Sequence, residues 1–373
     1  MNTEKYQNSE YRTKIKGMVY EMNSMRGNSK TPVDITFREY LKLNADKFGA
    51  DCTPEKVYDS FGINPAVDTA QNLFSMPDED VRWLVPEIWR DAIRLGLRKA
   101  PIWTSLIAAQ QSVPQTTIKM PHLNISEAVA SRVNEGETIP LGNISYGSKS
   151  VSIYKVGKGI KITDEVKDYV SLNVVSIFLQ DFGIKMGHSL DTLLIDVLIN
   201  GDQANGSESA PVIGITTINT LTYRDLLRIF IRMSRIGRTP NTMIAGETMA
   251  LDTLDLDEFK TRRTGSPDKT LNLKTPVPSS VDFFIHGNVP DDQIIMVDTS
   301  ASVIKLDAKP LMVESDRIVS NQTSETYASL TTGFATLFRD GRAIVDQSVD
   351  FDVEGFPSYL DPSTQENVPF ANN

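Results

Sequence analysis

Cysteine and histidine are scarce in this sequence of 373 residues, which contains one cysteine and three histidines. The single thiol, Cys52, cannot form a disulfide framework or a cysteine-rich metal site, and we interpret it as a small packed or surface residue. The histidines His122, His188 and His286 share neither an HxxxH nor an HExxH spacing. The sequence therefore predicts no histidine metal site, and we assign no metal ligand and no cofactor.

Long apolar runs and an excess of positive charge are also missing. No window approaches the roughly eighteen consecutive apolar residues of a membrane span, so we expect no contact with a membrane. The polar residues 1–30 lack the apolar core of a signal peptide, so we expect a soluble protein made in a cytoplasm. The 48 acidic residues outnumber the 38 Lys and Arg, for a net charge of −10. This balance argues against a protein that grips phosphates.

Catalytic signatures are missing as well. The sequence has no Walker loop, no dinucleotide fingerprint, no GxSxG and no paired nucleophile and base. Asp252, Asp255 and Glu258 fall roughly on one face of a predicted helix and could bind a hard cation, but the loop of a calcium site is absent. A solvated acidic face is the simpler interpretation, and a two-domain enzyme using such carboxylates is the alternative from another class. We assign no catalytic residue.

The first hundred residues carry helix signals. Thr31-Pro32 and Thr53-Pro54 each place a capping hydroxyl before a proline at the first helical position, and Gly49 and Gly62 are suitable helix ends. Pro86 opens a longer helix with apolar residues at helical spacing. Such short helices need a larger body to pack on.

Residues 115–162 are rich in β-forming side chains and predict an extended hairpin with an acidic, glycine-containing tip. The apolar alternation changes phase between Ile153 and Tyr154, which predicts a bulge or a strand covered on both sides. Few large apolar residues lie near the tip, and a hairpin of this kind is poorly stabilised in isolation. We therefore expect the hairpin to contact something outside itself.

A long helix is predicted from about residue 163 to residue 200. Its apolar side chains form one stripe at three- and four-residue spacing, and Gly201 ends it. At about 1.5 Å per residue the helix would be roughly 55 Å long. Gly183 and Gly187 form a GxxxG, which indicates close packing with another element.

Helices and strands alternate after residue 203 and predict a compact α/β lobe. Thr222 and Asp225 form a capping pair for a helix over residues 223–236. This helix carries a stripe of arginines that either contacts an acidic partner or is a solvated face with local ion pairs, and we favour the local ion pairs. The stripe consists of Arg224, Arg228, Arg232 and Arg235, followed by Arg238. Near the end of the chain, Asp340-Gly341 predicts a two-residue hairpin.

In this order the parts resemble the major capsid protein of tailed double-stranded DNA bacteriophages, the Hong Kong 97-type fold. Residues 85–107 and 112–123 resemble the arm that enters that family's peripheral domain. Residues 134–201, beginning NEGETIPLG, resemble its extended loop and spine helix, and residues 310–349, beginning PLMVESDRIV, resemble its closing strands. The resemblance covers the chain from about residue 80 and lies in the order of elements, since no single residue carries it.

The resemblance implies an α+β fold with an N-terminal arm, an extended β-hairpin loop, a long spine helix, a peripheral domain and an axial α/β domain. The arm is expected over residues 1–100, of which 1–30 are expected to be mobile. The peripheral domain with the spine helix is expected over 101–118 and 161–202, and the extended loop over 119–160. The axial domain is expected over 203–312, further peripheral strands over 313–349, and a C-terminal strand or tail over 350–373.

The implied function is structural and non-enzymatic: self-assembly into hexamers and pentamers of an icosahedral shell that encloses DNA without specific contacts. We expect a virion location, assembly in the host bacterial cytoplasm, and portal, scaffold or decoration proteins as further partners. An encapsulin-like bacterial nanocompartment shell is the nearest alternative. The candidate contacts between subunits are Arg132, Glu135, Glu137, Lys149, Arg228, Arg232, Arg339 and Arg342.

Overall fold

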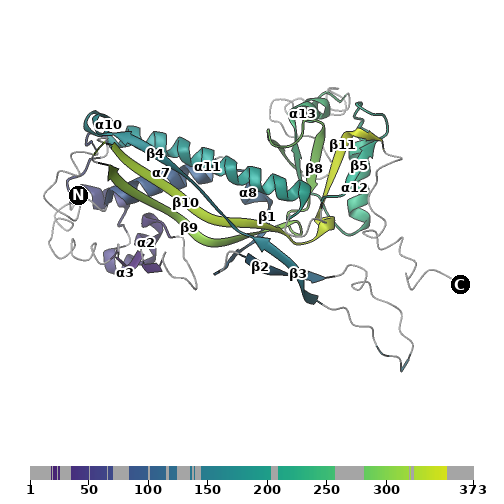
Figure 1. Cartoon of the computed structure of the whole chain (residues 1–373), viewed down its shortest axis with the longest axis horizontal. Coiled ribbons are helices and arrows are strands. Elements are labelled where there is room, and N and C mark those ends of the chain that lie inside the picture. The colour runs from purple at the N-terminus through teal and green to yellow at the C-terminus, as the bar shows by residue number, and fades with distance from the viewer. Residues whose placement is uncertain are drawn as a thin grey trace.

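The described part of the chain is organised around an elongated body with a lobe at one end (Figure 1). The structure is a computed structural model. It describes residues 18, 20–22, 24–25, 35–49, 51–64, 66–69, 84–99, 101–114, 117–123, 135–136, 138, 144–202, 209–256, 281–318, 320 and 323–350. None of the helices in these ranges is long and apolar enough to cross a membrane.

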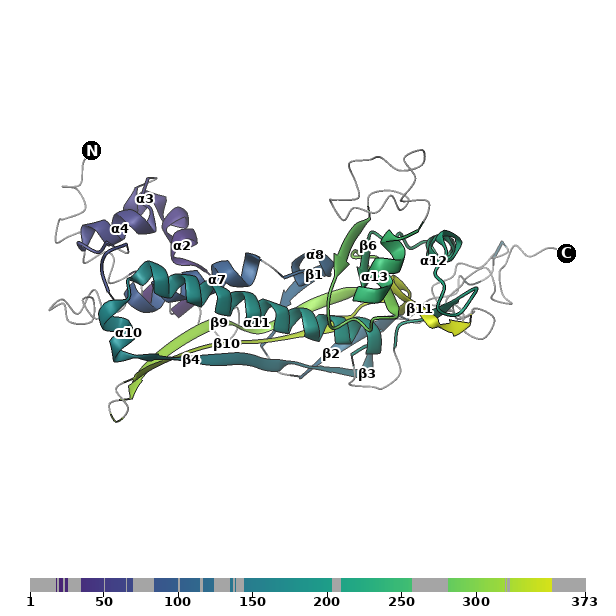
Figure 2. The same cartoon turned by 90° about the horizontal axis from the view of Figure 1, so that it is seen from above.

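The body consists of two helices packed on a four-stranded sheet. The helices are α7 (Leu84–Lys99) and α11 (Leu172–Asn200), which run side by side along the sheet (Figures 1 and 2). The strands lie in the order β1 (Ile107–Ser112), β9 (Val303–Ile318), β10 (Thr323–Thr336) and β4 (Tyr154–Thr163). Only the β1–β9 pair is parallel. The body thus joins segments that are about 200 residues apart in the sequence.

The predicted long helix is confirmed, but it starts later than expected. Residues 164–169 form a separate helix, α10 (Asp164–Tyr169), and the chain is extended at Val170 before α11 begins at Leu172. The Leu172 N–H donates to the carbonyl oxygen of Asp68 at 3.0 Å, and Thr69 forms a β-bridge with Ser171. The break therefore lets the chain pair with the N-terminal region, a long-range contact that no local pattern reveals.

Glycines set the distance between α7 and α11. A Cβ added to Gly183 would lie 2.1 Å from the Ile93 carbonyl oxygen, and one added to Gly96 would lie 2.0 Å from the Gln180 carbonyl oxygen. Neither position can hold a side chain without moving a backbone. The close packing predicted from the GxxxG is confirmed at Gly183. A Cβ added to Gly187 would lie 3.4 Å from its nearest neighbours, Leu97 and Pro101, which is an ordinary van der Waals contact.

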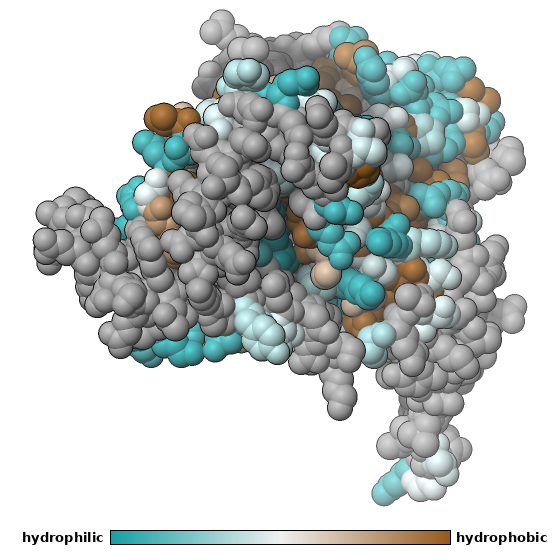
Figure 3. Space-filling model, turned by 60° about the vertical axis from the view of Figure 1, so that its left-hand side comes forward, coloured by the Kyte–Doolittle hydropathy of each residue, from teal (hydrophilic) through white to brown (hydrophobic). Residues whose placement is uncertain are grey.

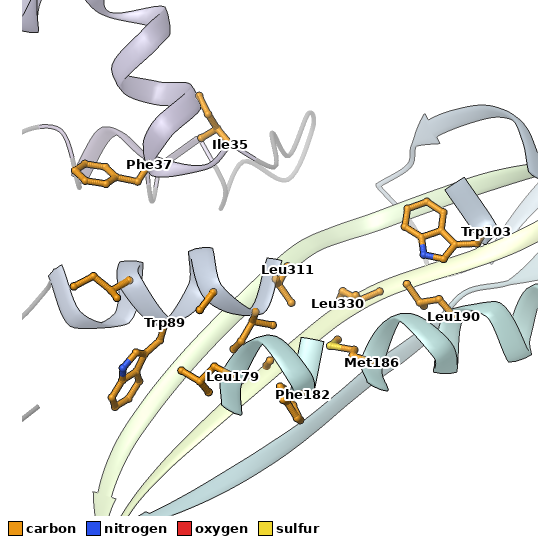
Figure 4. Close-up of a cluster of buried hydrophobic side chains, with 14 of the residues drawn as sticks. Ile35, Phe37, Trp89, Trp103, Leu179, Phe182, Met186, Leu190, Leu311 and Leu330 are labelled. Carbon is orange, nitrogen blue, oxygen red and sulfur yellow. The ribbon is translucent and has the colours of Figure 1, made fainter. Parts of the chain in front are cut away.

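Large apolar side chains fill the space around this crossing (Figure 4). Trp89 on α7 and Leu179 and Leu190 on α11 are all at most 1% exposed. They pack in one cluster with Leu311 of β9 and Leu330 of β10. Burial of this apolar area is the main favourable term that holds the two helices on the sheet.

The predicted extended hairpin is a separate two-stranded ribbon. Its strands, β2 (Thr117–Leu123) and β3 (Ile144–Ser152), pair antiparallel with each other and with no other described strand. After Ile153 the chain enters β4, which joins the body sheet instead. The phase change predicted between Ile153 and Tyr154 is therefore neither a bulge nor a strand covered on both sides: it marks the passage of the chain from one sheet to the other. Ile153 itself is buried in a small cluster with Val151 and Leu306.

The lobe contains a mixed five-stranded sheet. Its order is β5 (Val212–Ile215), β11 (Arg342–Asp350), β8 (Gln293–Val297), β6 (Thr242–Ala245) and β7 (Asp282–Ile285). Helices α12 (Tyr223–Arg235) and α13 (Glu247–Leu254) supply Leu226, Met233 and Met249 to its core, all 0% exposed. The α/β character predicted for this region is therefore correct.

The hairpin predicted at Asp340-Gly341 is wrong. Residues 339–341 form a short 3-10 turn, and the strands on either side, β10 and β11, lie in different sheets. The turn is held by the lobe, because Asp298 N–H donates to the Gly341 carbonyl oxygen at 2.8 Å. Residues 342–349, expected among the peripheral strands, consequently lie in the lobe, while β9 already enters the body at residue 303.

Short N-terminal helices lie beside α7 (Figure 2). They are α2 (Phe37–Leu43), α3 (Ala45–Phe48) and α4 (Pro54–Ser60), and α8 (Trp103–Leu106) follows α7. The helix start at Thr53-Pro54 is confirmed by the Thr53 side chain, which accepts from Lys56 N–H. The start predicted at Thr31-Pro32 lies outside the described residues.

We predict that Gly183→Ala and Gly187→Ala have opposite effects on the stability of the subunit. Alanine favours a helix over glycine by about 1 kcal/mol, and at Gly187 there is room for the methyl group. At Gly183 the clash with the Ile93 carbonyl should outweigh that gain and lower the free energy of unfolding by about 1–3 kcal/mol. Denaturant unfolding of both variants measures this; equal values for the two would contradict the glycine crossing.

Candidate assembly surfaces

The ribbon extends away from the body (Figure 1). Its base is buried, since Val151 is 1% exposed and packs in the cluster of Ile153. Of the contact residues predicted here, Glu135 is exposed, and Lys149 lies on β3. Arg132 and Glu137 lie outside the described residues. The ribbon therefore presents two strand edges that no other described strand of this chain pairs.

A second surface is an apolar stripe on the open side of α11. Val174, Ile177 and Phe178 are 41%, 63% and 68% exposed, and they stand at helical spacing on one face. Tyr169 of α10, at 86%, is exposed nearby in the sequence. We predicted one apolar stripe on this helix and missed this second one, although the three- and four-residue spacing of these side chains was visible. Elsewhere, hydrophobic residues are interspersed with hydrophilic ones on the described part of the face in Figure 3.

A cleft of about 590 Å³ lies between α7, α8 and the body sheet. Four cationic side chains line it, against one carboxylate. The lining cations are Arg94, Arg98, Lys305 and Lys309, and the carboxylate is that of Asp307. Arg98 is 56% exposed, and its guanidinium lies 3.5 Å from Glu39. The sequence could not predict this cleft, because its walls combine residues from 94–112 and 305–311 with Leu190 and Leu330, which lie far apart in the chain.

Inside the cleft, the Lys305 ammonium is held in place. It lies 2.9 Å from the Asp307 carboxylate and 4.4 Å from the centre of the Trp103 ring. Its side chain is 9% exposed. Lys305 therefore acts within the subunit, while Arg98 and the exposed Lys309 carry the positive charge that a partner can reach.

The arginine stripe of α12 is partly engaged in local ion pairs. Arg228 lies 3.1 Å from Asp225 and donates to Thr216 Oγ1 at 3.1 Å. Arg238 makes a two-pronged contact with Asp340, at 3.0 and 3.1 Å. The interpretation as local ion pairs is confirmed for these two residues. Arg224 and Arg235 are exposed, and Arg232 is half-buried.

Asp225 organises the start of α12. Its carboxylate accepts from the Thr222 N–H and hydroxyl and from the Thr216 N–H and hydroxyl, and the predicted capping pair is confirmed as a capping box. Burial alone would raise the pKa of Asp225, but the hydrogen bonds from Thr222 and Thr216 outweigh it and hold this pKa below its ordinary value. The helix start is thus stabilised by an ionised, buried carboxylate.

Two predicted contact residues near the end of the chain have different environments. Arg339 is half-buried and donates from Nε to the Ser209 carbonyl oxygen at 3.0 Å. Arg342 is 0% exposed, because it begins β11 inside the lobe. A side chain with no exposed surface cannot contact a neighbour, so the interpretation of Arg342 as a contact residue is corrected.

The acidic residues considered for a cation lie at the end of α13. Asp252 is half-buried and Asp255 is exposed just beyond the helix, while Glu258 lies outside the described residues. A different cluster was missed: His188, Asp191 and His286 offer ligand atoms within 4.8 Å of one another. A signal existed in part, because His188 and Asp191 stand three residues apart on one helix, but His286 is almost 100 residues away.

Comparison with protein families gives one match. Residues 146–347 match the model of a phage capsid protein family. No curated protein matches the chain significantly. The matched residues contain β4, α11, the lobe and the strands β9 and β10.

Several solved structures are weakly similar. A virus-like particle from Pyrococcus furiosus has a TM-score of 0.46 at 8% identity, over 69% of this chain and 97% of that chain. The holo-SrpI encapsulin complex from Synechococcus elongatus PCC 7942 gives 0.47 at 14% identity, over 70% and 91%. Mycobacterium phage Che8 gives 0.47 at 12% identity, over 63% and 85%. With TM-scores below 0.5, these likenesses add no argument to the family match.

We predict that Asp225→Asn lowers the free energy of unfolding by about 1–3 kcal/mol at pH 7. A carboxyl group whose pKa is lowered by folding stabilises the fold above its unfolded pKa of about 3.9 and loses that contribution as the pH falls through the folded pKa. The difference from the wild type should therefore shrink below about pH 4. Asp252→Asn, on the neighbouring helix, is the control and should change stability by less than about 0.5 kcal/mol. A difference that stays constant from pH 7 to pH 3 would contradict this role.

Proposed function

Because this chain belongs to the phage capsid protein family, it is a structural, shell-forming protein of a virion capsid, and we propose that it forms the hexamers and pentamers of an icosahedral shell around packaged double-stranded DNA. The match covers the residues 146–347, which include the long helix and the lobe.

The observation that carries the proposal is the ribbon. A two-stranded ribbon is marginally stable by itself in water, and three or more strands or a packed face are needed for independent stability. Here β2 and β3 form a sheet of their own, and the body covers the ribbon at its base. A second copy of the chain that covers the rest of the ribbon would supply the missing packing, as in obligate interfaces between identical subunits.

The apolar stripe of α11 supports the same proposal. Val174, Ile177 and Phe178 expose large apolar side chains beside one another. Contiguous apolar surface of this kind marks a site of protein contact. We assign the stripe to contact with a neighbouring copy in the shell, where its removal from water would favour assembly by about 25 cal/mol per Å² of apolar area.

Charge indicates how copies could be oriented. Glu135 and Glu137 give the ribbon tip negative charge, and Arg98 and Lys309 give the cleft of another copy positive charge. Complementary charges of this kind steer association and fix register more than they add affinity. Arg132 and Lys149 on the ribbon segment, and Arg228, Arg232 and Arg339 in and near the lobe, remain proposed contacts between subunits, and Arg342 is removed from that set.

The net charge of −10 supports a shell that encloses DNA without binding it tightly. We further propose assembly in the cytoplasm of the bacterial host and contact with portal, scaffold or decoration proteins. The encapsulin-like alternative is less well supported, because the matching family model describes a phage capsid protein. The enzyme alternative rests only on Asp252 and Asp255, at the end of α13.

We predict that a subunit without its ribbon tip folds but assembles poorly. Leu123 and Ile144 are directly paired across the ribbon, so residues 124–143 can be replaced by Asn-Gly, the preferred two-residue turn between antiparallel strands. The circular dichroism spectrum and melting temperature should match those of the wild type. The yield of particles, measured by sedimentation and negative-stain microscopy, should fall at least about tenfold, as expected from a loss of about 1.4 kcal/mol or more per contact.

Two results would contradict this proposal. Assembly at the wild-type yield would mean that the tip makes no essential contact between copies. Loss of folding would mean that the tip belongs to the core of its own subunit. A full-length control, Glu135→Gln with Glu137→Gln, separates the effect of removing the acidic charges from the effect of removing the tip segment itself. We expect it to assemble more slowly at low salt while it still forms shells.

A further inference from the structure

The junction between the long helix and the lobe contains a cluster of two histidines and a buried aspartate. His188 and Asp191 stand on one face of α11, and His286 directly follows β7 of the lobe. Asp191 Oδ2 lies 3.6 Å from His188 Nδ1 and 4.0 Å from His286 Nε2. The centres of the two imidazole rings are 6.1 Å apart.

The Asp191 carboxylate is held from one side only. Its Oδ1 accepts from the Trp103 N–H at 2.9 Å, which fixes the carboxylate at the start of α8. Its Oδ2 is fully buried and accepts no hydrogen bond from any described residue. A buried carboxylate oxygen without a partner is costly, and buried charges are normally paired or coordinate a metal. Oδ2 faces the two histidines, so any missing partner belongs between these three side chains.

We propose that His188, Asp191 and His286 bind one divalent transition-metal ion, with Zn²⁺ as the ion best suited to this set. Two imidazoles and one carboxylate are ligands typical of Zn²⁺, whereas Ca²⁺ and Mg²⁺ require more oxygen ligands. Zinc–ligand distances of about 2.0–2.2 Å place tetrahedral ligand atoms roughly 3.3–3.5 Å apart. The separations of 3.6 and 4.0 Å from Asp191 Oδ2 exceed these values by about 0.1–0.7 Å, and the two imidazole nitrogens lie within 4.8 Å of each other, so the side chains must draw together to hold an ion.

The exposures of the three side chains suit an ion that enters from solvent. The Asp191 side chain is 0% exposed, that of His286 is 11% exposed and that of His188 is 52% exposed. His188 can thus turn to close the site, and a water molecule can occupy the fourth position on its open side.

Burial shifts the pKa values of two members of the cluster in opposite directions. Burial raises the pKa of Asp191 above its ordinary value, although the N–H groups of Trp103 and Ile102 act against it. Burial lowers the pKa of His286, against the effect of Asp191.

One hydrogen bond of His286 opposes metal binding at its Nε2. His286 Nδ1 accepts from the Asn288 N–H at 3.2 Å, which places the ring proton on Nε2, the atom that faces Asp191. Binding at Nε2 moves this proton to Nδ1, which can then no longer accept from the Asn288 N–H. Changes in such outer partners cost about 10- to 100-fold in metal affinity, so we expect weaker binding than at a site with intact outer partners. Binding should weaken further at acidic pH, where protons compete for the imidazole nitrogens.

The site would join the two parts of the subunit. Thr192 on α11 donates to the Asn288 side chain at 3.2 Å, so the helix and the turn after β7 are already in contact beside the cluster. A metal ion shared by α11 and this turn would bind the folded chain only and raise its melting temperature. This inference concerns the subunit alone and holds whether or not shells form.

The test uses the full-length chain after treatment with a chelator and its removal. Titration with ZnCl₂, followed by equilibrium dialysis and elemental analysis, should give one Zn²⁺ per chain and a higher melting temperature. Co²⁺ should give visible absorption bands typical of four-coordinate cobalt. His188→Ala and Asp191→Asn should each weaken binding at least about tenfold. Asn at position 191 still accepts from the Trp103 N–H, and His188 is half-exposed, so both variants should fold.

His122→Ala is the matched control, because it removes the remaining histidine of the chain, on β2 of the ribbon. It should bind Zn²⁺ as the wild type does. Absence of saturable binding by the wild type would overturn the proposal and leave the cluster as a histidine–carboxylate ion pair. Equal binding by the wild type, His188→Ala and Asp191→Asn would overturn it too, since the ion would then be held elsewhere on the surface.

Discussion

The burial of α11 is the constraint on which the rest of the structure depends. This helix has 29 residues, and its buried apolar stripe needs cover along its whole length. One side is covered by α7 through the crossing of Gly183 and Gly96, and another by the body sheet at Leu330. The ribbon, the lobe and the short N-terminal helices are all attached to this assembly of two helices and a sheet. The open side of α11 still exposes Ile177 and Phe178 in the single subunit, and we propose that a neighbouring copy covers it.

Features with a local cause could be predicted from the sequence. The capping box of Thr222 and Asp225 depends on residues three positions apart, and the end of α11 at Gly201 depends on one glycine. Features decided by distant contacts could not. Asp340-Gly341 has the local chemistry of a hairpin, but the lobe takes β11 into another sheet and buries Arg342. The break before α11 likewise arises from a hydrogen bond to Asp68.

The same distinction applies to the surfaces. The ribbon could be predicted, because its alternation and its phase change at Ile153 lie within one stretch of sequence. The cleft of Arg98 and Lys309 and the cluster of Asp191 with His286 could not, since each is assembled from segments far apart in the chain. Some features of the subunit complete its own fold, and we propose that the ribbon, the cleft and the open face of α11 contact other copies. The family match supports this proposal, because capsid proteins assemble with copies of themselves.

The central claim is that neighbouring copies of this chain cover the ribbon and the open face of α11. A cryo-EM reconstruction of the particles formed by the full-length protein tests it most directly. We predict a closed shell in which density from an adjacent subunit lies over Val174, Ile177 and Phe178, and in which each ribbon lies on a neighbour. A protein that stays a 41.4 kDa monomer under all conditions would contradict the account. So would a shell in which these three side chains face solvent in every subunit.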